Sequence, residues 1–282
     1  MIDLHVHSYI SDGSDRPADI ISKAKELGIS AIALTDHDTI DGLEEADEAA
    51  KKVGITLIKG IELSVDYGNG RLLHILGLGI EPKNPVFSRI YTKYKTDRHN
   101  ALPIVIEQLQ KKGFPVVWEE LLEFQSGNWL DRQAIAKWLV KYGHATSISS
   151  AWIEIIDLIG YESGELISLE DALLMIKLSG GLSFLAHYNK LIGFEGYTAG
   201  EIETSIAELK VKGLDGIERY YPTFTKENHE ELDYLIERYE LLSSGGTDYH
   251  GLNRLSIQLG VGEGDFSVDD AVYEKLKPHL SY

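Results

Sequence analysis

Residue types that bind metals occur in pairs near both ends of this chain. His5 and His7 are two residues apart, and Asp248 and His250 repeat that spacing. On an extended strand, residues two apart project from the same face. Imidazole nitrogens and carboxylate oxygens are good ligands for divalent first-row metals. The two pairs therefore predict metal coordination by segments that are distant in sequence.

Further candidate ligands lie in or just after short apolar segments in the middle of the chain. These candidates are His37, Glu62, His74 and His187. A carboxylate such as Glu62 can bridge two ions roughly 3.5–4 Å apart, which suits a phosphoryl displacement. A lone histidine is more often a hydrogen-bonded structural residue. Six histidines recurring beside predicted strands favour a shared metal site over that alternative.

Seven short apolar segments predict the strands that position these residues. They cover residues 2–6, 31–34, 56–61, 72–78, 182–186, 215–220 and 241–244. Amphipathic helical patterns separate many of them, at 17–27, 41–53 and 201–212, and each is followed by a glycine. This alternation predicts parallel strands joined by helical crossovers. All the candidate ligands except His74 lie near the C-terminal end of a strand, where the loops of a parallel barrel converge.

The alternation stops between about Pro82 and Ser168, where helical patterns replace strands. The expected helices cover 89–113, 132–143 and 151–159. We therefore expect a discontinuous barrel domain, residues 1–82 and 168–282, and a helical insertion domain, residues 83–167.

Composition narrows the classes of partner. The chain has 45 acidic and 27 basic residues and a net charge of -18, which argues against binding long duplex nucleic acid or an anionic membrane. It has no cysteine, so a metal would rest on nitrogen and oxygen ligands, with manganese, iron or zinc as candidates. No segment approaches the ~20 apolar residues of a membrane span, and a cytoplasmic protein is expected.

Four motifs give the chain a resemblance to a known family. They are DLHVHS at residues 3–8, followed by Asp12, then TDHDT at 35–39, GIELS at 60–64 and GTDYHG at 246–251. Together they resemble the motifs of PHP domains, the polymerase and histidinol phosphatase family. The resemblance covers the chain to about Gly79 and again from about Ser168, and it implies an α/β fold, a distorted seven-stranded (β/α) barrel.

The resemblance also implies a ligand set for two or three divalent metal ions. A first ion would be held by His5, His7, Glu62 and Asp248, a second by Glu62, His74 and His187, and a third by Asp12, His37 and His250. Asp36 and Asp38 would orient ligands or cap the following helix.

Within the family, the chain resembles phosphoesterases with a helical insertion that act on 3′,5′-bisphosphorylated nucleosides or on ends of short RNA. Arg98 and Arg132 are then candidate phosphate ligands, with surface ion pairing as the alternative. Tyr220 is a candidate platform for a nucleobase, with a place in the core as the alternative. One departure is Ala186-His187-Tyr188, where the family pattern has Ala-His-Pro.

The expected reaction is hydrolysis of a phosphomonoester by a metal-activated water, with the 3′-phosphate of a nucleoside 3′,5′-bisphosphate as first choice. Glu62 would bridge the metals, and His187 or Asp248 would assist proton transfer. Three alternatives stay open. They are a phosphodiesterase acting on short RNA 5′ ends or cyclic phosphates, a histidinol phosphate phosphatase, and a metal-stabilised binding module without turnover.

Overall fold

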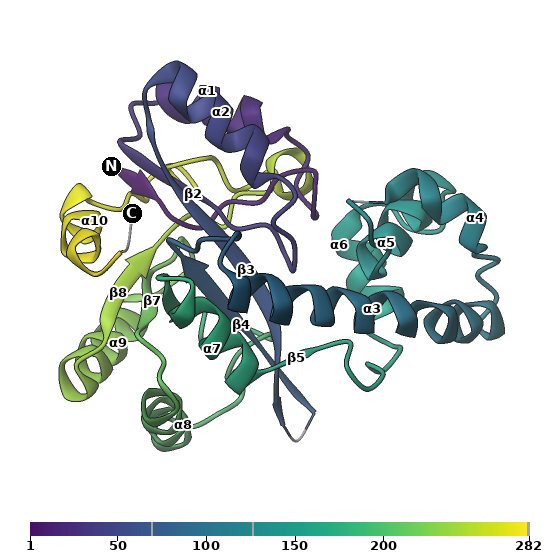
Figure 1. Cartoon of the computed structure of the whole chain (residues 1–282). Coiled ribbons are helices and arrows are strands. Elements are labelled where there is room, and N and C mark those ends of the chain that lie inside the picture. Colours follow the sequence, from purple (N-terminus) through teal and green to yellow (C-terminus); the bar gives the residue numbers. More distant parts are fainter. Residues whose placement is uncertain (69, 126, 281–282) are drawn as a thin grey trace. The chain divides into compact units, whose positions relative to one another are not determined.

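The computed structural model describes residues 1–68, 70–125 and 127–280, and the chain divides into two units (Figure 1). The first unit comprises Met1–Phe87 and Ser168–Tyr282, and the second comprises Ser88–Ile167. The first unit carries the sheet, and the second is helical.

Seven strands of the first unit form one hydrogen-bonded sheet. In spatial order they are β1 (Ile2–Asp3), β2 (Ala31–Leu34), β3 (Thr56–Gly68), β4 (Arg71–Leu78), β6 (Leu182–Leu185), β7 (Gly216–Tyr220) and β8 (Leu242–Gly245). Each one overlaps a strand predicted from the sequence. The eighth strand of the sheet, β5 (Ile167–Ser168), lies off this order, where the chain passes from one unit to the other.

The expectation of parallel strands is wrong for β4. β4 pairs antiparallel with both β3 and β6, whereas β1–β2–β3 and β6–β7–β8 are parallel. β3 ends at Gly68 and β4 begins at Arg71, and so short a connection has no room for a crossover helix. Gly68 and Gly70 both adopt positive φ there, a conformation that glycine takes without a steric penalty.

Backbone hydrogen bonds join the two ends of this sheet and close it. Leu4 N donates to Gly245 O (3.1 Å), Asp248 N donates to His5 O (2.9 Å), and His7 N donates to Tyr249 O (2.9 Å). The result is a distorted barrel, in which the segment after β1 lies beside the segment after β8. The two sequence pairs His5/His7 and Asp248/His250 are thereby brought together.

Helices surround this barrel. They are α1 (Pro17–Glu26), α2 (Leu43–Val53), α7 (Leu169–Leu178), α8 (Ala199–Lys212), α9 (Lys226–Tyr239) and α10 (Asp270–Leu276). As predicted, Gly54 and Gly213 end α2 and α8 in the left-handed conformation. The core between strands and helices includes Leu4, Leu76 and Phe184.

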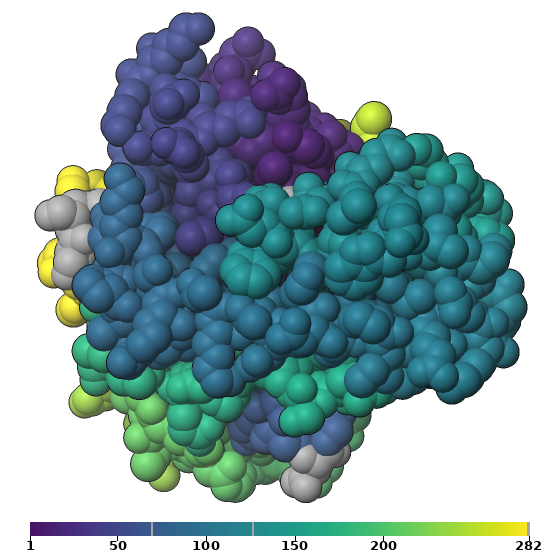
Figure 2. All heavy atoms as spheres, turned by 45° about the vertical axis from the view of Figure 1, so that its right-hand side comes forward, coloured from purple at the N-terminus to yellow at the C-terminus, as the bar shows by residue number. Residues whose placement is uncertain are grey.

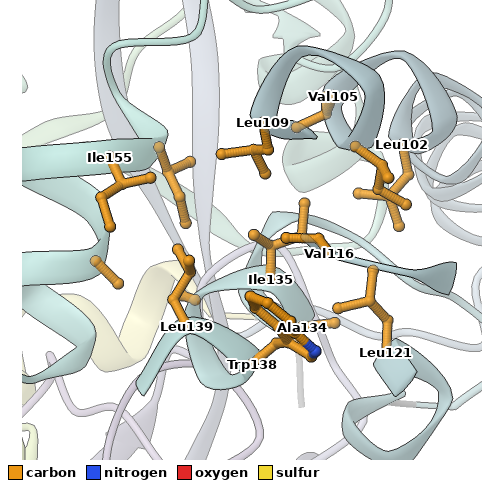
Figure 3. Close-up of a cluster of buried hydrophobic side chains, with 14 of the residues drawn as sticks. Leu102, Val105, Leu109, Val116, Leu121, Ala134, Ile135, Trp138, Leu139 and Ile155 are labelled. Carbon is orange, nitrogen blue, oxygen red and sulfur yellow. The ribbon is translucent and has the colours of Figure 1, made fainter. Parts of the chain in front are cut away.

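The second unit has a hydrophobic core of its own. Its helices are α3 (Pro85–Lys111), which begins in the first unit, α4 (Trp118–Leu121), α5 (Arg132–Lys141) and α6 (Ile148–Ala151), the last continuing as a π-helix over Trp152–Ile156. Figure 3 shows Leu109 of α3 near Ile135 and Leu139 of α5. The space-filling view shows one face of this unit, coloured blue to teal (Figure 2). None of the helices described is long and apolar enough to cross a bilayer.

Candidate metal centre

Glu62, on β3, is the centre of a buried group of histidines. Its side chain is inaccessible to solvent. The ring nitrogens within 3.2 Å of Oε2 belong to His5, His7 and His37, and those at 3.1 Å from Oε1 belong to His74 and His187. Each oxygen of one carboxylate thus faces a different set of imidazoles. This is the arrangement that a carboxylate bridging two ions requires.

Two aspartates and His250 complete the group. Asp248 Oδ1 lies 3.4 Å from His5 Nε2 and 3.2 Å from His7 Nε2. Asp12 lies 3.1 Å from His250 and 3.6 Å from both His7 and His37. All nine residues proposed as ligands from the sequence therefore lie together.

Their donor atoms form four groups in which all atoms lie within 4.8 Å of one another. The groups are His7, Asp12, His37 and His250; His5, Glu62 and His187; His5, His7 and Asp248; and His37, Glu62 and His74. They overlap the three sets implied by the family resemblance without being identical to them.

Several of these nitrogen and oxygen atoms are suited to bind a cation because they form no hydrogen bond among the described residues. The buried atoms concerned are His5 Nε2, both ring nitrogens of His7, Glu62 Oε2 and His74 Nδ1. An unsatisfied buried polar atom is costly, by about 1–3 kcal/mol. Nitrogen and oxygen donors that converge in this way fit a divalent first-row metal.

The electrostatics of the group favour positive charge at its centre. Burial by itself would raise the pKa of Glu62, but His5 and His74 hold it well below the usual range. Burial would lower the pKa of His7, but Asp248 and Glu62 raise it to about 10. Burial lowers the pKa of His37 to about 4, which leaves that ring neutral. Protons and metal ions therefore compete for the same ring nitrogens.

Hydrogen bonds fix which nitrogen several histidines present. His187 Nδ1 lies 3.1 Å from Ile192 O, and His250 Nδ1 lies 2.8 Å from Asp248 O. A carbonyl oxygen can only accept, so Nδ1 carries the proton in both rings. Nε2 is then the atom available to a metal.

Glu218, a buried residue of β7, contacts two of the candidate ligands. Its Oε1 accepts from His5 Nδ1 (2.9 Å), and its Oε2 accepts from the backbone N–H of His187 (2.8 Å). In the sequence, the prediction near Glu218 concerned only Tyr220, as a candidate platform for a nucleobase. Nothing in the sequence pattern pairs this glutamate with His5, 213 residues away.

Asp36 and Asp38 hold the ligand-bearing loops. Asp36 accepts from the backbone N–H and hydroxyl of Ser8, both at 2.7 Å, and from the Ser11 hydroxyl at 2.6 Å. Asp38 accepts from the N–H of Ser64 at 2.7 Å and from its hydroxyl at 2.8 Å. These contacts agree with the orienting role suggested by the sequence.

Two candidate ligands have unusual backbone conformations. His187 has φ 27° and Asp248 has φ 56°, values that residues other than glycine rarely adopt. Such strain costs about 1–3 kcal/mol and concentrates at functional sites. Tyr188 stands where the family resemblance predicts proline; it is buried, and its hydroxyl donates to Glu231 at 2.5 Å.

Arg254 and Tyr221 contact the outer oxygen of Asp248, and sequence reasoning missed both contacts. Arg254 Nη1 donates to Asp248 Oδ2 at 2.5 Å, and the Tyr221 hydroxyl donates to the same atom at 2.8 Å. Arg254 Nη2 also donates to the Tyr221 hydroxyl at 3.1 Å. Arg254 lies four residues beyond His250, but no local pattern distinguishes it.

The residues predicted to bind substrate have other contacts in this structure. Arg132 is buried, and its guanidinium donates to both oxygens of Glu165 at 2.8 and 2.7 Å. Its remaining donors contact the carbonyl oxygens of Ile156, Ile159 and Gly160. The structure thus gives Arg132 a role inside the second unit, and phosphate binding by this residue remains a prediction without support from these contacts.

Arg98 and Tyr220 likewise remain predictions. Arg98 is buried and donates to the Tyr94 hydroxyl at 2.7 Å and to Glu165 O at 3.1 Å. Tyr220 is half-buried against the barrel core, with the Arg219 guanidinium 4.7 Å from its ring centre.

Comparisons with known proteins agree with this site. A model of the PHP domain matches residues 3–257. The phosphoribosyl 1,2-cyclic phosphate 1,2-diphosphodiesterase of Eggerthella lenta is 32% identical, over 88% of this chain and 94% of that protein. The 3′,5′-nucleoside bisphosphate phosphatase of Chromobacterium violaceum is 30% identical, over 88% and 87%. A 5′-3′ exoribonuclease of Haemophilus influenzae is also 30% identical, over 88% and 89%.

Solved structures resemble the whole chain. One is described as a metal-dependent phosphoesterase of Bifidobacterium adolescentis, with TM-score 0.81 and 25% identity over 99% of this chain and 96% of that one. Another is described as an amidohydrolase of Chromobacterium violaceum with bound sulfate and no metal, with TM-score 0.80 and 26% identity over 99% and 97%.

Proposed function

This chain belongs to the PHP domain family and is a metal-dependent phosphoesterase, and from that premise we propose that it removes the 3′-phosphate from a nucleoside 3′,5′-bisphosphate. The observation that carries the proposal is the position of Glu62. Its two oxygens face separate groups of imidazoles, as a site that acts on a phosphate through two cations requires.

We assign the ions to the ligand groups implied by the family motifs. His5, His7, Glu62 and Asp248 would hold one ion, Glu62, His74 and His187 a second, and Asp12, His37 and His250 a third where it binds. When bound, such ions lower the pKa of a water and neutralise charge on phosphate oxygens. Manganese, iron and zinc all suit these donors.

The protein's own contribution is to hold the ligands in place before substrate arrives. Glu218 fixes the ring of His5 and the backbone of His187, and Arg254 and Tyr221 fix the outer oxygen of Asp248. Loss of a contact of this kind, around the ligands of a metal, typically lowers metal affinity or activity 10- to 100-fold.

Neither His187 nor Asp248 is left free to transfer a proton in this arrangement. His187 donates from Nδ1 to Ile192 O and points Nε2 at Glu62, and both oxygens of Asp248 face other groups. We therefore leave proton transfer by His187 or Asp248 as a prediction, and propose solvent as the alternative source of the leaving group's proton.

A cyclic phosphodiesterase is the second candidate, because the Eggerthella lenta relative is 32% identical over nearly its whole length. Both this relative and the bisphosphate phosphatase act, by their names, on molecules with two phosphate groups.

A substrate panel separates the candidates. The metal-loaded protein would be assayed for kcat/KM on adenosine 3′,5′-bisphosphate, a 5-phosphorylated ribose 1,2-cyclic phosphate, a 5′-phosphorylated short RNA and histidinol phosphate. We expect the bisphosphate to be preferred at least about tenfold, a difference of ~1.4 kcal/mol in transition-state binding. No release of phosphate from the bisphosphate, with turnover of the cyclic ester, would replace the first candidate by the second.

A further inference from the structure

Two cationic side chains lie over one aromatic ring at the edge of the metal centre. The guanidinium carbon of Arg254 and the ammonium nitrogen of Lys190 are each 5.9 Å from the centre of the Tyr221 ring. Tyr221 in turn donates to Asp248, one of the proposed metal ligands. The two cations are therefore next to the reaction site.

These two cations are poorly compensated by the protein. Among the described residues, the Lys190 ammonium forms no hydrogen bond or ion pair, and Arg254 pairs only with Asp248 and Tyr221. Burial lowers the pKa of Lys190, and Arg254 lowers it further, whereas Glu195 acts in the opposite direction. Two positive charges close together attract an anion, even though the net charge of the whole chain is -18.

Both cations have donors to spare. A guanidinium carries five N–H donors and an ammonium three, and Arg254 uses two of its five in the contacts with Asp248 and Tyr221. Phosphate oxygens accept from such groups in charge-assisted hydrogen bonds.

The region around the two cations is open to solvent, and both cations lie a few residues after a candidate metal ligand. Lys190 lies three residues after His187, and Arg254 lies four residues after His250. Their neighbours Leu191 and Leu255 are 70% and 75% exposed. A small molecule can therefore approach these side chains while it also reaches the metal ligands.

We propose that Lys190 and Arg254 form a subsite for the second, non-reacting phosphate of the substrate, an inference that rests on the proposed function. The reacting phosphate would lie at the metal ligands, and the second would lie between the two cations. The subsite would thus select doubly phosphorylated molecules over those with one phosphate.

The test uses Lys190, because Arg254 also holds Asp248. In metal-loaded protein, we would measure the dissociation constant of adenosine 5′-monophosphate by calorimetry. We would also measure the ratio of kcat/KM for adenosine 3′,5′-bisphosphate to that for adenosine 3′-monophosphate. The variants are Lys190→Ala and Lys190→Arg. The matched control is Lys226→Ala, which removes an exposed lysine paired with Glu230 on α9.

Loss of one charge-assisted hydrogen bond weakens binding by about 10- to 100-fold. We expect Lys190→Ala to weaken binding of the monophosphate, and to lower the kcat/KM ratio, by that factor. Lys190→Arg should restore most of both, and Lys226→Ala should match wild type. Equal affinity and an equal ratio in Lys190→Ala and Lys226→Ala would overturn the subsite.

The outcomes separate the subsite from the proposed reaction. If wild-type protein hydrolyses neither adenosine phosphate, the proposed function fails, but selective loss of nucleotide binding in Lys190→Ala still supports the subsite. If the bisphosphate is hydrolysed and Lys190→Ala behaves as the control does, the reaction stands and the subsite fails. Should Lys190→Ala unfold below the temperature of the assay, the comparison would be made with Lys190→Gln.

Discussion

Substitution of Arg132 by alanine tests whether this arginine stabilises the helical unit or binds phosphate. The side chain is 1% exposed and forms a bidentate ion pair with Glu165, which is 2% exposed. Its other donors contact three backbone carbonyl oxygens. Arg132→Ala would leave the Glu165 carboxylate buried, with the backbone N–H of Glu162 as its remaining donor among the described residues.

The expected loss of stability is large. Removal of one partner from a buried ion pair costs about 3–5 kcal/mol, a large part of the roughly 5–15 kcal/mol that stabilises a typical domain. With a urea m value of about 1.5 kcal/mol/M, the unfolding midpoint should fall by about 2–3 M. An exposed pair supplies the control, because Lys93→Ala, which removes the partner of Asp97, should change stability by less than about 1 kcal/mol.

Tryptophan fluorescence follows the helical unit selectively. All four tryptophans of the chain lie within Ser88–Ile167, namely Trp118, Trp129, Trp138 and Trp152. Urea unfolding monitored by this signal should show the loss in Arg132→Ala and little change in Lys93→Ala. If Arg132→Ala keeps the wild-type midpoint but raises KM for the bisphosphate tenfold or more, the structural role is refuted and the phosphate role is supported.

Three further predictions concern the metal centre and the second unit. Glu62→Gln should lower bound metal, counted by elemental analysis, by at least one ion per chain and nearly abolish activity; full metal content would refute the bridge. Glu218→Gln should weaken metal binding about 10- to 100-fold in a chelator competition, and unchanged affinity would exclude its orienting role. Burial would raise the pKa of Asp131, but Lys95 holds it below the ordinary value, so this pair stabilises above pH ~4 and the stability is lost as pH falls. Asp131→Asn keeps the acceptor for Gln133 N but should destabilise the unit at pH 7 by about 3 kcal/mol and flatten its acid dependence. A wild-type urea midpoint that is the same at pH 7 and pH 3 would contradict this.

Local sequence patterns predicted the strands and eight of the candidate ligands, and the family resemblance added Asp12 and the distorted barrel. Residues two apart on a strand share a face, and the ends of parallel strands meet at one opening, so His5, His7, Asp248 and His250 could be placed together from sequence alone. The family resemblance rested on the same segments and is confirmed by the match over residues 3–257. Because the chain has no cysteine, its metal ligands are limited to nitrogen and oxygen donors whatever fold it adopts.

Only the tertiary structure decided what the charged side chains outside these motifs contact. A guanidinium can bind phosphate or a buried carboxylate with the same donors, so the sequence around Arg132 could not reveal its pairing with Glu165. The contact of Glu218 with His5 and that of Lys190 with the ring of Tyr221 join different strands or loops, and neither has a local signature. The candidate ligands were predicted from residue types, their spacing and the family motifs, whereas the orientation of these side chains and the charges around them depended on how distant segments pack.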